Sequence, residues 1–127
     1  MGLLLPVWHW SRSKMLKLHN SYSNNVEEFR PDSNSVKVYL CGPTVQSSPH
    51  IGHGRSAVVF DFLIRYLKFS NYQVTFVRNI TDIEDKIIQR SEEEGITTEE
   101  LADRVTKEFQ KSYADLNCLL PNHEPKA

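Results

Sequence analysis

Three side chains that can bind metal ions or phosphates lie close together in the sequence: Cys41, His50 and His53. A cysteine thiolate is a soft ligand that suits zinc. Two histidines three residues apart lie near one face of a helix's first turn, where they can donate hydrogen bonds to phosphate oxygens. Gly52 has no side chain, so a ligand can approach the backbone there. The segment thus predicts a phosphate site with a thiol beside it.

Each of these residues also has an ordinary structural interpretation. A cysteine at the end of a strand is more often a small buried residue than a metal ligand. His50 and His53 can simply occupy a loop and cap a helix. No second ligand is spaced near Cys41 as zinc motifs require. The acidic residues within 82–85 fit a solvated helix start better than a metal site.

Hydrophobic patterning predicts the elements that position this segment. Residues 36–41 form a β-branched and aromatic run, expected to be a buried strand, and residues 72–78 alternate as a second strand. Between them a helix is expected from about Ile51 or His53 to Phe69. A strand, a long helix and a strand imply parallel strands in an α/β sheet, whose carboxyl edge is where ligands bind.

The other expected elements flank this unit. Residues 16–22 and 26–29 read as a weak hairpin around a turn at 23–25. Thr81 and Glu84 form one candidate capping box, opening a helix that ends near Gly95, and Thr97 with Glu100 form another. Two strands are too few for a finished sheet, so the fold is expected to be the first part of a longer one. The residues expected in the core include Phe60, Phe62, Tyr66, Phe69, Leu101, Val105, Phe109, Tyr113, Leu116 and Cys118.

Composition limits the partners. The chain has 15 basic and 16 acidic residues, without the basic excess or patch of a surface that grips phosphates. This charge balance does not indicate DNA binding. A membrane is not indicated either, because no apolar run approaches the roughly 20 residues that span a bilayer. Two cysteines outside any CxxC pair suit a reducing, cytoplasmic setting. Residues 1–14 are expected to be an extension with Met15 as a possible start; because residues 1–24 contain no acid, an organellar leader is conceivable.

Three segments together resemble the cysteinyl-tRNA synthetases, which are class I aminoacyl-tRNA synthetases. The run His50-Ile-Gly-His53 is similar to the HIGH signature of the class. The preceding Cys41-Gly-Pro-Thr-Val45 resembles the cysteine-specific branch. Residues 78–88 are similar to that family's second signature, except that Glu84 stands where Asp is usual. The resemblance covers residues 15–127 and implies the first part of a Rossmann-like parallel-sheet nucleotide-binding domain, truncated.

The resemblance implies a function and its residues. The family uses ATP, with Mg, to activate L-cysteine as cysteinyl-adenylate and then transfers cysteine to tRNA(Cys). His50 and His53 would be catalytic and would bind ATP together with Gly52, while Cys41 would bind a zinc ion that the substrate thiol completes. The residues placed against the amino acid or its adenylate are Gly42, Thr44, Ser56, Asn79 and Thr81. Ser56 stands where the family often has Thr.

Other parts of the family's machinery have no counterpart in this sequence. They are the further zinc ligands, the KMSKS loop that binds ATP phosphates and the anticodon-binding region. We therefore expect residues 1–127 alone to be inactive. Two other functions remain open: the related ligase that joins cysteine to an amino sugar in mycothiol synthesis, and a non-catalytic nucleotide-binding module.

Overall fold

A computed structural model describes residues 16–127, which divide into a compact unit ending at Asp32 and a second unit, Ser33–Ala127. The expected N-terminal extension, residues 1–14, and Met15 lie outside the described residues. Within 16–127, no helix is both long and apolar enough to cross a lipid bilayer.

The first unit is the expected hairpin. Strand β1 (Lys17–Asn20) pairs antiparallel with β2 (Asn25–Glu28), with Lys17 opposite Glu28. The turn lies slightly earlier than predicted, at residues 21–24. Asn24 closes it with a φ of 56°, a left-handed conformation that asparagine tolerates better than most residues.

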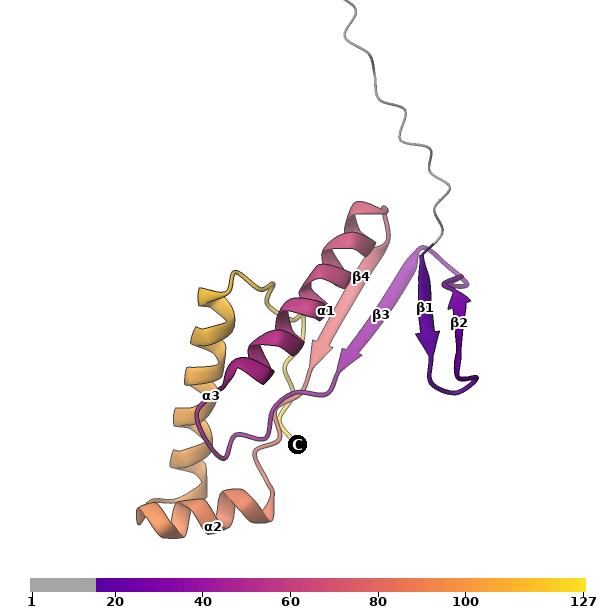
Figure 1. The fold of residues 1–127 in the computed structure, drawn as a ribbon. Helices are drawn as coiled ribbons and strands as arrows, with labels where there is room; N and C mark the ends of the chain where they lie inside the picture. The colour runs from indigo at the N-terminus through magenta and orange to yellow at the C-terminus, as the bar shows by residue number, and fades with distance from the viewer. Residues whose placement is uncertain (1–15) are drawn as a thin grey trace, which may run out of the picture. The chain divides into compact units, whose positions relative to one another are not determined.

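The second unit begins with a strand, helix and strand (Figure 1). Strand β3 (Ser35–Leu40) leads into helix α1 (Ile51–Phe69), and β4 (Gln73–Arg78) returns parallel to β3, from Ser35 opposite Gln73 to Leu40 opposite Arg78. The predicted parallel α/β unit is therefore confirmed. One face of β3 is covered rather than both, because Val36 and Leu40 are buried whereas Lys37 and Tyr39 are exposed.

Two more helices follow, α2 (Asp85–Glu94) and α3 (Thr98–Asp115), and α3 packs against both α2 and α1. Two apolar clusters hold the unit together. One joins α1 to the two strands, and the other joins α1, α2 and α3 to the segments that follow β3 and β4. The first comprises Leu40, Ile64 and Phe76, and the second Val45, Ala57, Ile80, Ile87, Leu101, Ala102, Val105, Phe109 and Tyr113.

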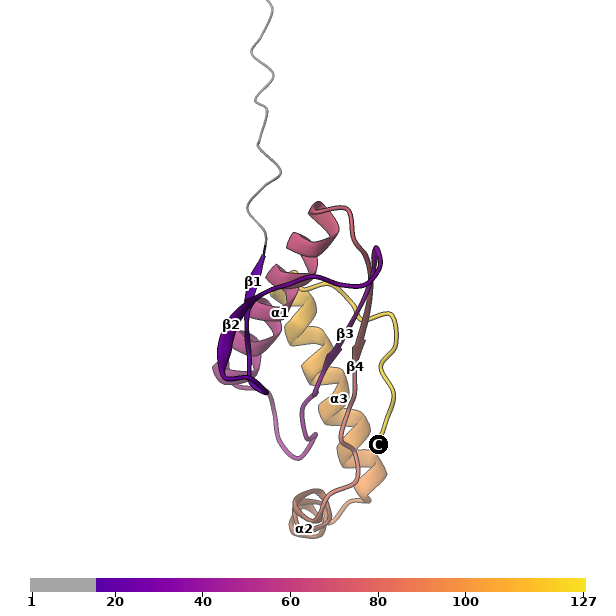
Figure 2. The same ribbon diagram turned by 90° about the vertical axis from the view of Figure 1, so that its right-hand side faces the viewer.

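The end of the chain pairs with β4 as a third parallel segment of the sheet. Residues 122–127 run parallel to β4 along the edge that β3 leaves open (Figures 1 and 2). Arg78 N–H donates to the His123 carbonyl at 3.1 Å, and Ile80 N–H donates to the Pro125 carbonyl at 2.9 Å. The sequence Asn-His-Glu-Pro-Lys-Ala has no strand pattern, and the expectation of only two strands missed it. β4 is thus paired along both edges.

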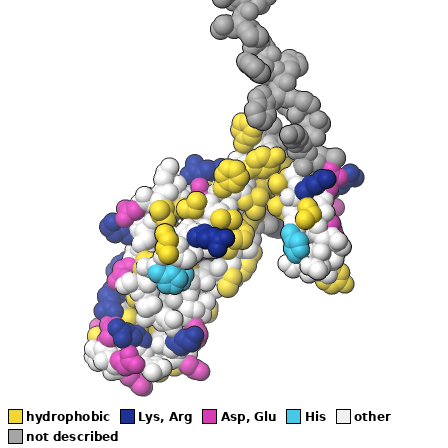
Figure 3. Space-filling view, viewed as in Figure 1, with side chains coloured by type: hydrophobic (Ala, Val, Ile, Leu, Met, Phe, Trp, Pro, Cys, Tyr) yellow, Lys and Arg dark blue, Asp and Glu magenta, His cyan; other side chains and the backbone are white. Residues whose placement is uncertain are grey.

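The burial of α1 differs from the prediction. Phe62 and Phe69 were expected in the core but are 72% and 81% exposed, and Val59 is exposed as well. Hydrophobic side chains gather along α1 on the surface (Figure 3). The helix is apolar on several sides, so its periodicity could not tell which side is buried. Ile64 and Leu67 are buried, and Ile64 packs with Phe76 of β4. Leu116, expected to continue the α3 stripe, is also exposed.

The Thr81 capping box is wrong. α2 begins at Asp85, and its N-cap is Glu84, which makes no side-chain cap hydrogen bond. Thr81 instead forms a parallel bridge with Thr44, its N–H donating to the Pro43 carbonyl at 3.0 Å. This pairing keeps the chain extended past β4, and the helix starts only after it.

The Thr97 capping box is confirmed and supports a stability prediction. Thr97 Oγ1 accepts the Glu100 N–H at 3.1 Å, and the Glu100 carboxylate accepts the Thr97 N–H at 3.0 Å. We expect Thr97→Ala to lower the free energy of unfolding by about 1 kcal/mol and Thr97→Ser to restore most of it. Urea unfolding followed by circular dichroism measures this. Thr98→Ala is the matched control, and an equal loss there would contradict the cap's role.

Candidate functional site

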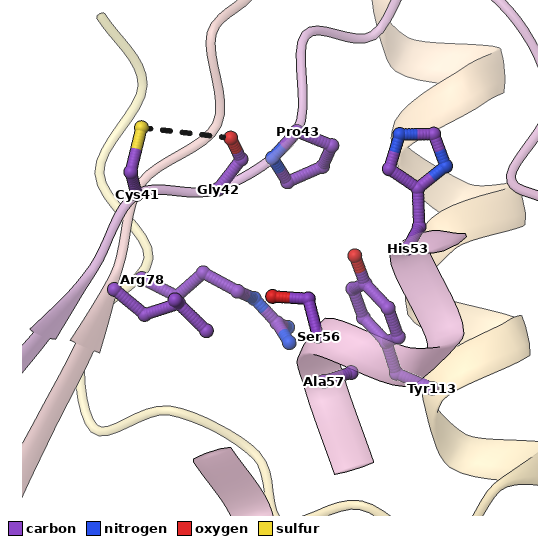
Figure 4. Close-up of a pocket in the computed structure, with 9 residues that line it drawn as sticks. Cys41, Gly42, Pro43, His53, Ser56, Ala57, Arg78 and Tyr113 are labelled. Carbon is purple, nitrogen blue, oxygen red and sulfur yellow. Dashed lines mark hydrogen bonds between the residues drawn. The ribbon is translucent and has the colours of Figure 1, made fainter. Parts of the chain in front are cut away.

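A pocket lies at the carboxyl ends of β3 and β4, where the sequence places its chemical groups (Figure 4). The end of β3, the first turns of α1, the end of β4 and α3 all contribute to its wall. Its lining residues are Leu40, Cys41, Gly42, Pro43, His53, Ser56, Ala57, Arg78 and Tyr113. Four of these, Cys41, Gly42, His53 and Ser56, belong to the predicted site.

Cys41 follows β3 directly, and its side chain is exposed rather than buried as a structural cysteine would be. Its thiol has one polar contact, with the Gly42 carbonyl 3.9 Å away. Among residues 16–127, no three histidine, cysteine or acidic side chains gather closely enough to hold a metal ion. Cys41 can therefore supply one soft ligand, and the described residues do not build a four-coordinate zinc site around it.

Gly42 and Asn79 join the two strand ends. Gly42 N–H donates to Asn79 Oδ1 at 2.8 Å. A Cβ at Gly42 would lie 1.6 Å from the Asn79 carbonyl oxygen, so only glycine fits. Asn79 Nδ2 in turn donates to Thr81 Oγ1 at 3.3 Å. One amide side chain thus fixes the backbone at the pocket and the threonine beside it.

Thr44 and Thr81 lie next to each other, although neither lines the pocket. Val45 N–H donates to the Thr81 carbonyl at 3.1 Å, which continues the parallel pairing beyond the strands. The structure therefore brings Gly42, Thr44, Asn79 and Thr81 together at the pocket. Hydrogen bonds link Gly42, Asn79 and Thr81, and Thr44 pairs with Thr81 as a parallel bridge.

The two histidines form a reciprocal cap at the start of α1. His50 Nδ1 accepts the Gly52 N–H at 3.1 Å, and His53 Nδ1 accepts the His50 N–H at 3.2 Å. The ring centres are 3.9 Å apart. Because each Nδ1 is an acceptor, each neutral ring carries its proton on Nε2. The capping interpretation is thus correct, and it leaves both Nε2–H groups available as donors.

His53 stays neutral near pH 7. Partial burial lowers its pKa, and the neighbouring charge of His50 lowers the pKa further. Its ring packs edge-on against Phe109, with the ring centres 4.9 Å apart. This contact fixes one face of the imidazole while the ring edge borders the pocket.

Gly52 makes room for the histidine cap. A Cβ there would lie 2.9 Å from Cε1 of the His50 ring. Neither Gly52 nor His50 lines the pocket. Both instead lie at the amino end of α1, where the helix dipole favours an anion.

Sequence reasoning gave no role in the site to Arg78 and Tyr113, two residues of the pocket wall. Arg78 is 3% exposed, and its guanidinium carbon lies 4.2 Å from the centre of the Tyr113 ring. Burial raises the pKa of Tyr113, so its hydroxyl is neutral. A signal for Arg78 was present, because it continues the inward-facing positions Val74 and Phe76 of β4, where a charge needs a partner.

A helix that starts with the His-Ile-Gly-His run at the carboxyl edge of parallel strands defines the catalytic domain of a class I aminoacyl-tRNA synthetase. The family model described as tRNA synthetases class I (C) catalytic domain matches residues 28–127. The chain belongs to this cysteine-specific synthetase family.

Curated relatives agree with the family. The chain is 53% identical over 113 residues to a cysteine–tRNA ligase of Rickettsia massiliae, covering 87% of the chain and 25% of the relative. Similar proteins of the same name come from Erwinia tasmaniensis (48% over 114 residues, 89% and 25%) and Francisella philomiragia (48% over 110 residues, 86% and 24%). The chain spans about a quarter of the length of these relatives.

Proposed function

We propose that the protein carrying this chain is a cysteine–tRNA ligase, which activates L-cysteine with ATP and transfers it to tRNA(Cys). The relatives' name supports the substrates. The observation that carries the proposal is the pair of Nε2–H donors at the start of α1, beside a pocket that presents the Cys41 thiol and the Gly42 backbone.

The first step forms an anhydride. A carboxylate oxygen of cysteine attacks the α-phosphorus of Mg-bound ATP, the bond to the β-phosphate oxygen breaks, and pyrophosphate leaves. Negative charge grows on the phosphate oxygens in the transition state. His50 and His53 stabilise that charge by donating from Nε2, at the amino end of α1 where the helix dipole also favours the nucleotide's phosphates.

The amino acid is assigned to the other side of the pocket. Gly42 lines the pocket wall with its backbone, and Ser56 offers a hydroxyl from α1. Thr44, Asn79 and Thr81 are assigned to the amino acid or its adenylate. Support for this comes from the hydrogen bonds that tie Asn79 to both Gly42 and Thr81. The polar group is already ordered, so binding requires little rearrangement.

Zinc fits this site in one respect. The exposed Cys41 thiol is a suitable soft donor at the pocket wall. When bound, the ion would favour the deprotonated thiol of cysteine over the hydroxyl of serine, which a hydrophobic pocket could not do. Its other protein ligands must come from outside residues 16–127, since the described part supplies only Cys41.

The chain's place in the whole protein is also proposed. We assign residues 15–127 to the first part of a Rossmann-like nucleotide-binding domain, with 1–14 an extension. The support is that β3, β4 and residues 122–127 already make three parallel rows. Both described cysteines are free thiols, which suits the reducing cytoplasm.

The assay of this function is cysteine-dependent ATP–pyrophosphate exchange by the full-length protein, followed by charging of tRNA(Cys). Cysteine should support exchange and serine should not. Tests with tRNA and with an amino sugar as acceptors decide between the tRNA ligase and the amino-sugar ligase. A protein that binds ATP without any exchange would instead be a non-catalytic module.

His50→Ala and His53→Ala test the role of the two Nε2–H donors at the start of α1. Each removes a donor to developing charge, so we expect adenylate formation to slow roughly 100-fold, with little change in cysteine affinity. Stopped exchange reactions at saturating cysteine measure the rate. His19→Ala, on the exposed hairpin, is the matched control. Weakened cysteine binding at an unchanged rate would mean that the histidines position the substrate instead.

A further inference from the structure

Arg78 contacts three separate elements around the pocket. Its guanidinium donates to Glu124 Oε1 from Nε at 3.0 Å and from Nη2 at 2.6 Å. The same group lies over the ring of Tyr113, which belongs to α3. The stem of Arg78 passes below Gly42, since its Cγ would be 3.2 Å from a Cβ built there. Figure 4 shows the side chain extending from the strand end toward Tyr113.

Glu124 is held from the other side. Its second carboxylate oxygen accepts Gln110 Nε2 at 2.8 Å, and Gln110 lies on α3. The side chains of Arg78 and Glu124 are only 4% and 19% exposed. A pair with a buried guanidinium is costly to break, because removing Glu124 leaves that charge without compensation. The exposed ion pairs of α2, such as Arg90 with Glu93, lack this property.

The pair lies directly beside the polar group of the pocket. Asn79, the next residue after Arg78, holds the Gly42 N–H and the Thr81 hydroxyl. The Arg78 N–H itself donates to the carbonyl of His123, next to Glu124. Any shift of Arg78 therefore moves the residue that orders the amino-acid side of the pocket.

We propose that Arg78 is a positioning residue for cysteine binding, locked by Glu124 and Tyr113 so that Asn79 holds Gly42 in place. This inference rests on the proposed function. It assigns to Arg78 a role in cysteine binding that is exerted through Asn79 and Gly42. Glu124 neutralises the guanidinium, so Arg78 offers the substrate a fixed wall rather than a free charge. Residues 122–127 thereby become part of the site's support without contacting the substrate.

The test compares Arg78→Met, Arg78→Lys, Glu124→Gln and the double variant Arg78→Met/Glu124→Gln in the full-length protein. We expect each single variant to raise the KM for cysteine about 10-fold in pyrophosphate exchange, with the KM for ATP within about twofold of wild type. Arg78→Lys keeps the positive charge but loses the planar guanidinium and its stacking on the Tyr113 ring. We therefore expect lysine to restore little of the wild-type KM for cysteine. Arg90→Met is the matched control and should change neither constant.

The double variant separates positioning from stability. It removes both buried charges, so its thermal stability should recover relative to the singles. The KM for cysteine should stay raised, because the side-chain contacts that hold Arg78 in place are then missing. A KM that recovers together with stability, or single variants with an unchanged KM, would overturn the proposal. If Arg78→Met does not fold, the KM for cysteine of Glu124→Gln and of Arg78→Lys tests the proposal by the same criterion.

Hydrogen exchange keeps this inference separate from the proposed function. In Glu124→Gln, amides of residues 76–82 and 122–127 should exchange faster by mass spectrometry, while those of β3 are unchanged. A wild-type protein without cysteine-dependent exchange of pyrophosphate would refute the proposed ligase. Unchanged amide protection in Glu124→Gln would refute the lock itself, whatever the activity.

Discussion

Replacing Cys41 by serine in the full-length protein is expected to abolish tight zinc binding and to reduce cysteine activation more than 100-fold. Changing an outer partner of a metal ligand already costs about 10–100-fold, and this change removes a ligand atom itself. The serine hydroxyl is a hard, protonated oxygen and a poor substitute for a thiolate. Cys41 is exposed at the end of β3, so the substitution leaves the core untouched.

Atomic absorption and cysteine-dependent pyrophosphate exchange measure the two effects. Cys118→Ser is the matched control. That thiol is partly buried against the helical core, and burial raises its pKa, so it is an inert packing residue. We expect Cys118→Ser to retain zinc and activity. A Cys41→Ser protein with its zinc and normal exchange would refute the ligand assignment.

Gly42→Ala is expected to lower the free energy of unfolding by about 3 kcal/mol, the upper end of the usual cost of overpacking, because the contact is with rigid backbone. The new Cβ would lie 1.6 Å from the Asn79 carbonyl oxygen and 2.7 Å from its carbon. Both are backbone atoms at the end of β4, so no rotamer change relieves the clash. The bond from Gly42 N–H to Asn79 would be lost as well.

Urea unfolding measures the effect of Gly42→Ala, and Gly54→Ala is its control. A Cβ at Gly54 meets only the end of the Leu116 side chain, 3.2 Å away, and that leucine is half exposed and can move. Alanine also favours the helix by about 1 kcal/mol over glycine. We therefore expect Gly54→Ala to be neutral or mildly stabilising. A similar loss in both variants would show that the close approach at Gly42 is not special.

Local patterns predicted the framework of the fold well. The alternation in β4 and the apolar spacing of α1 were enough to place two parallel strands and their crossover. Pairing between segments far apart in the sequence was harder to predict. Residues 122–127 have no strand pattern, and their hydrogen bonds to β4 depend on where α3 delivers the chain. Thr81 failed as a cap for the same reason, since its bridge to Thr44 lies outside any local window.

The candidate site also has a part that local motifs predicted and a part that depends on long-range contacts. Signature motifs identified Cys41, His50 and His53, and the structure brings Cys41 and His53 to one pocket. Their proposed roles in catalysis and metal binding stay predictions. The sequence could not supply the partner of Arg78, because Glu124 is 46 residues away and reaches it only through the fold. Nor could it show which side of α1 stays exposed at Phe62, since that depends on neighbouring elements.

The parallel row formed by residues 122–127 has a consequence for synthesis on the ribosome. β4 is complete at Arg78, yet its partner Glu124 is made 46 residues later. At about 5–20 residues per second, the open edge of β4 waits roughly 2–9 seconds for that partner. An unpaired strand edge invites pairing with other chains. The nascent protein therefore has a window in which chaperones that cover strand edges would protect it, and the window closes when Glu124 reaches Arg78.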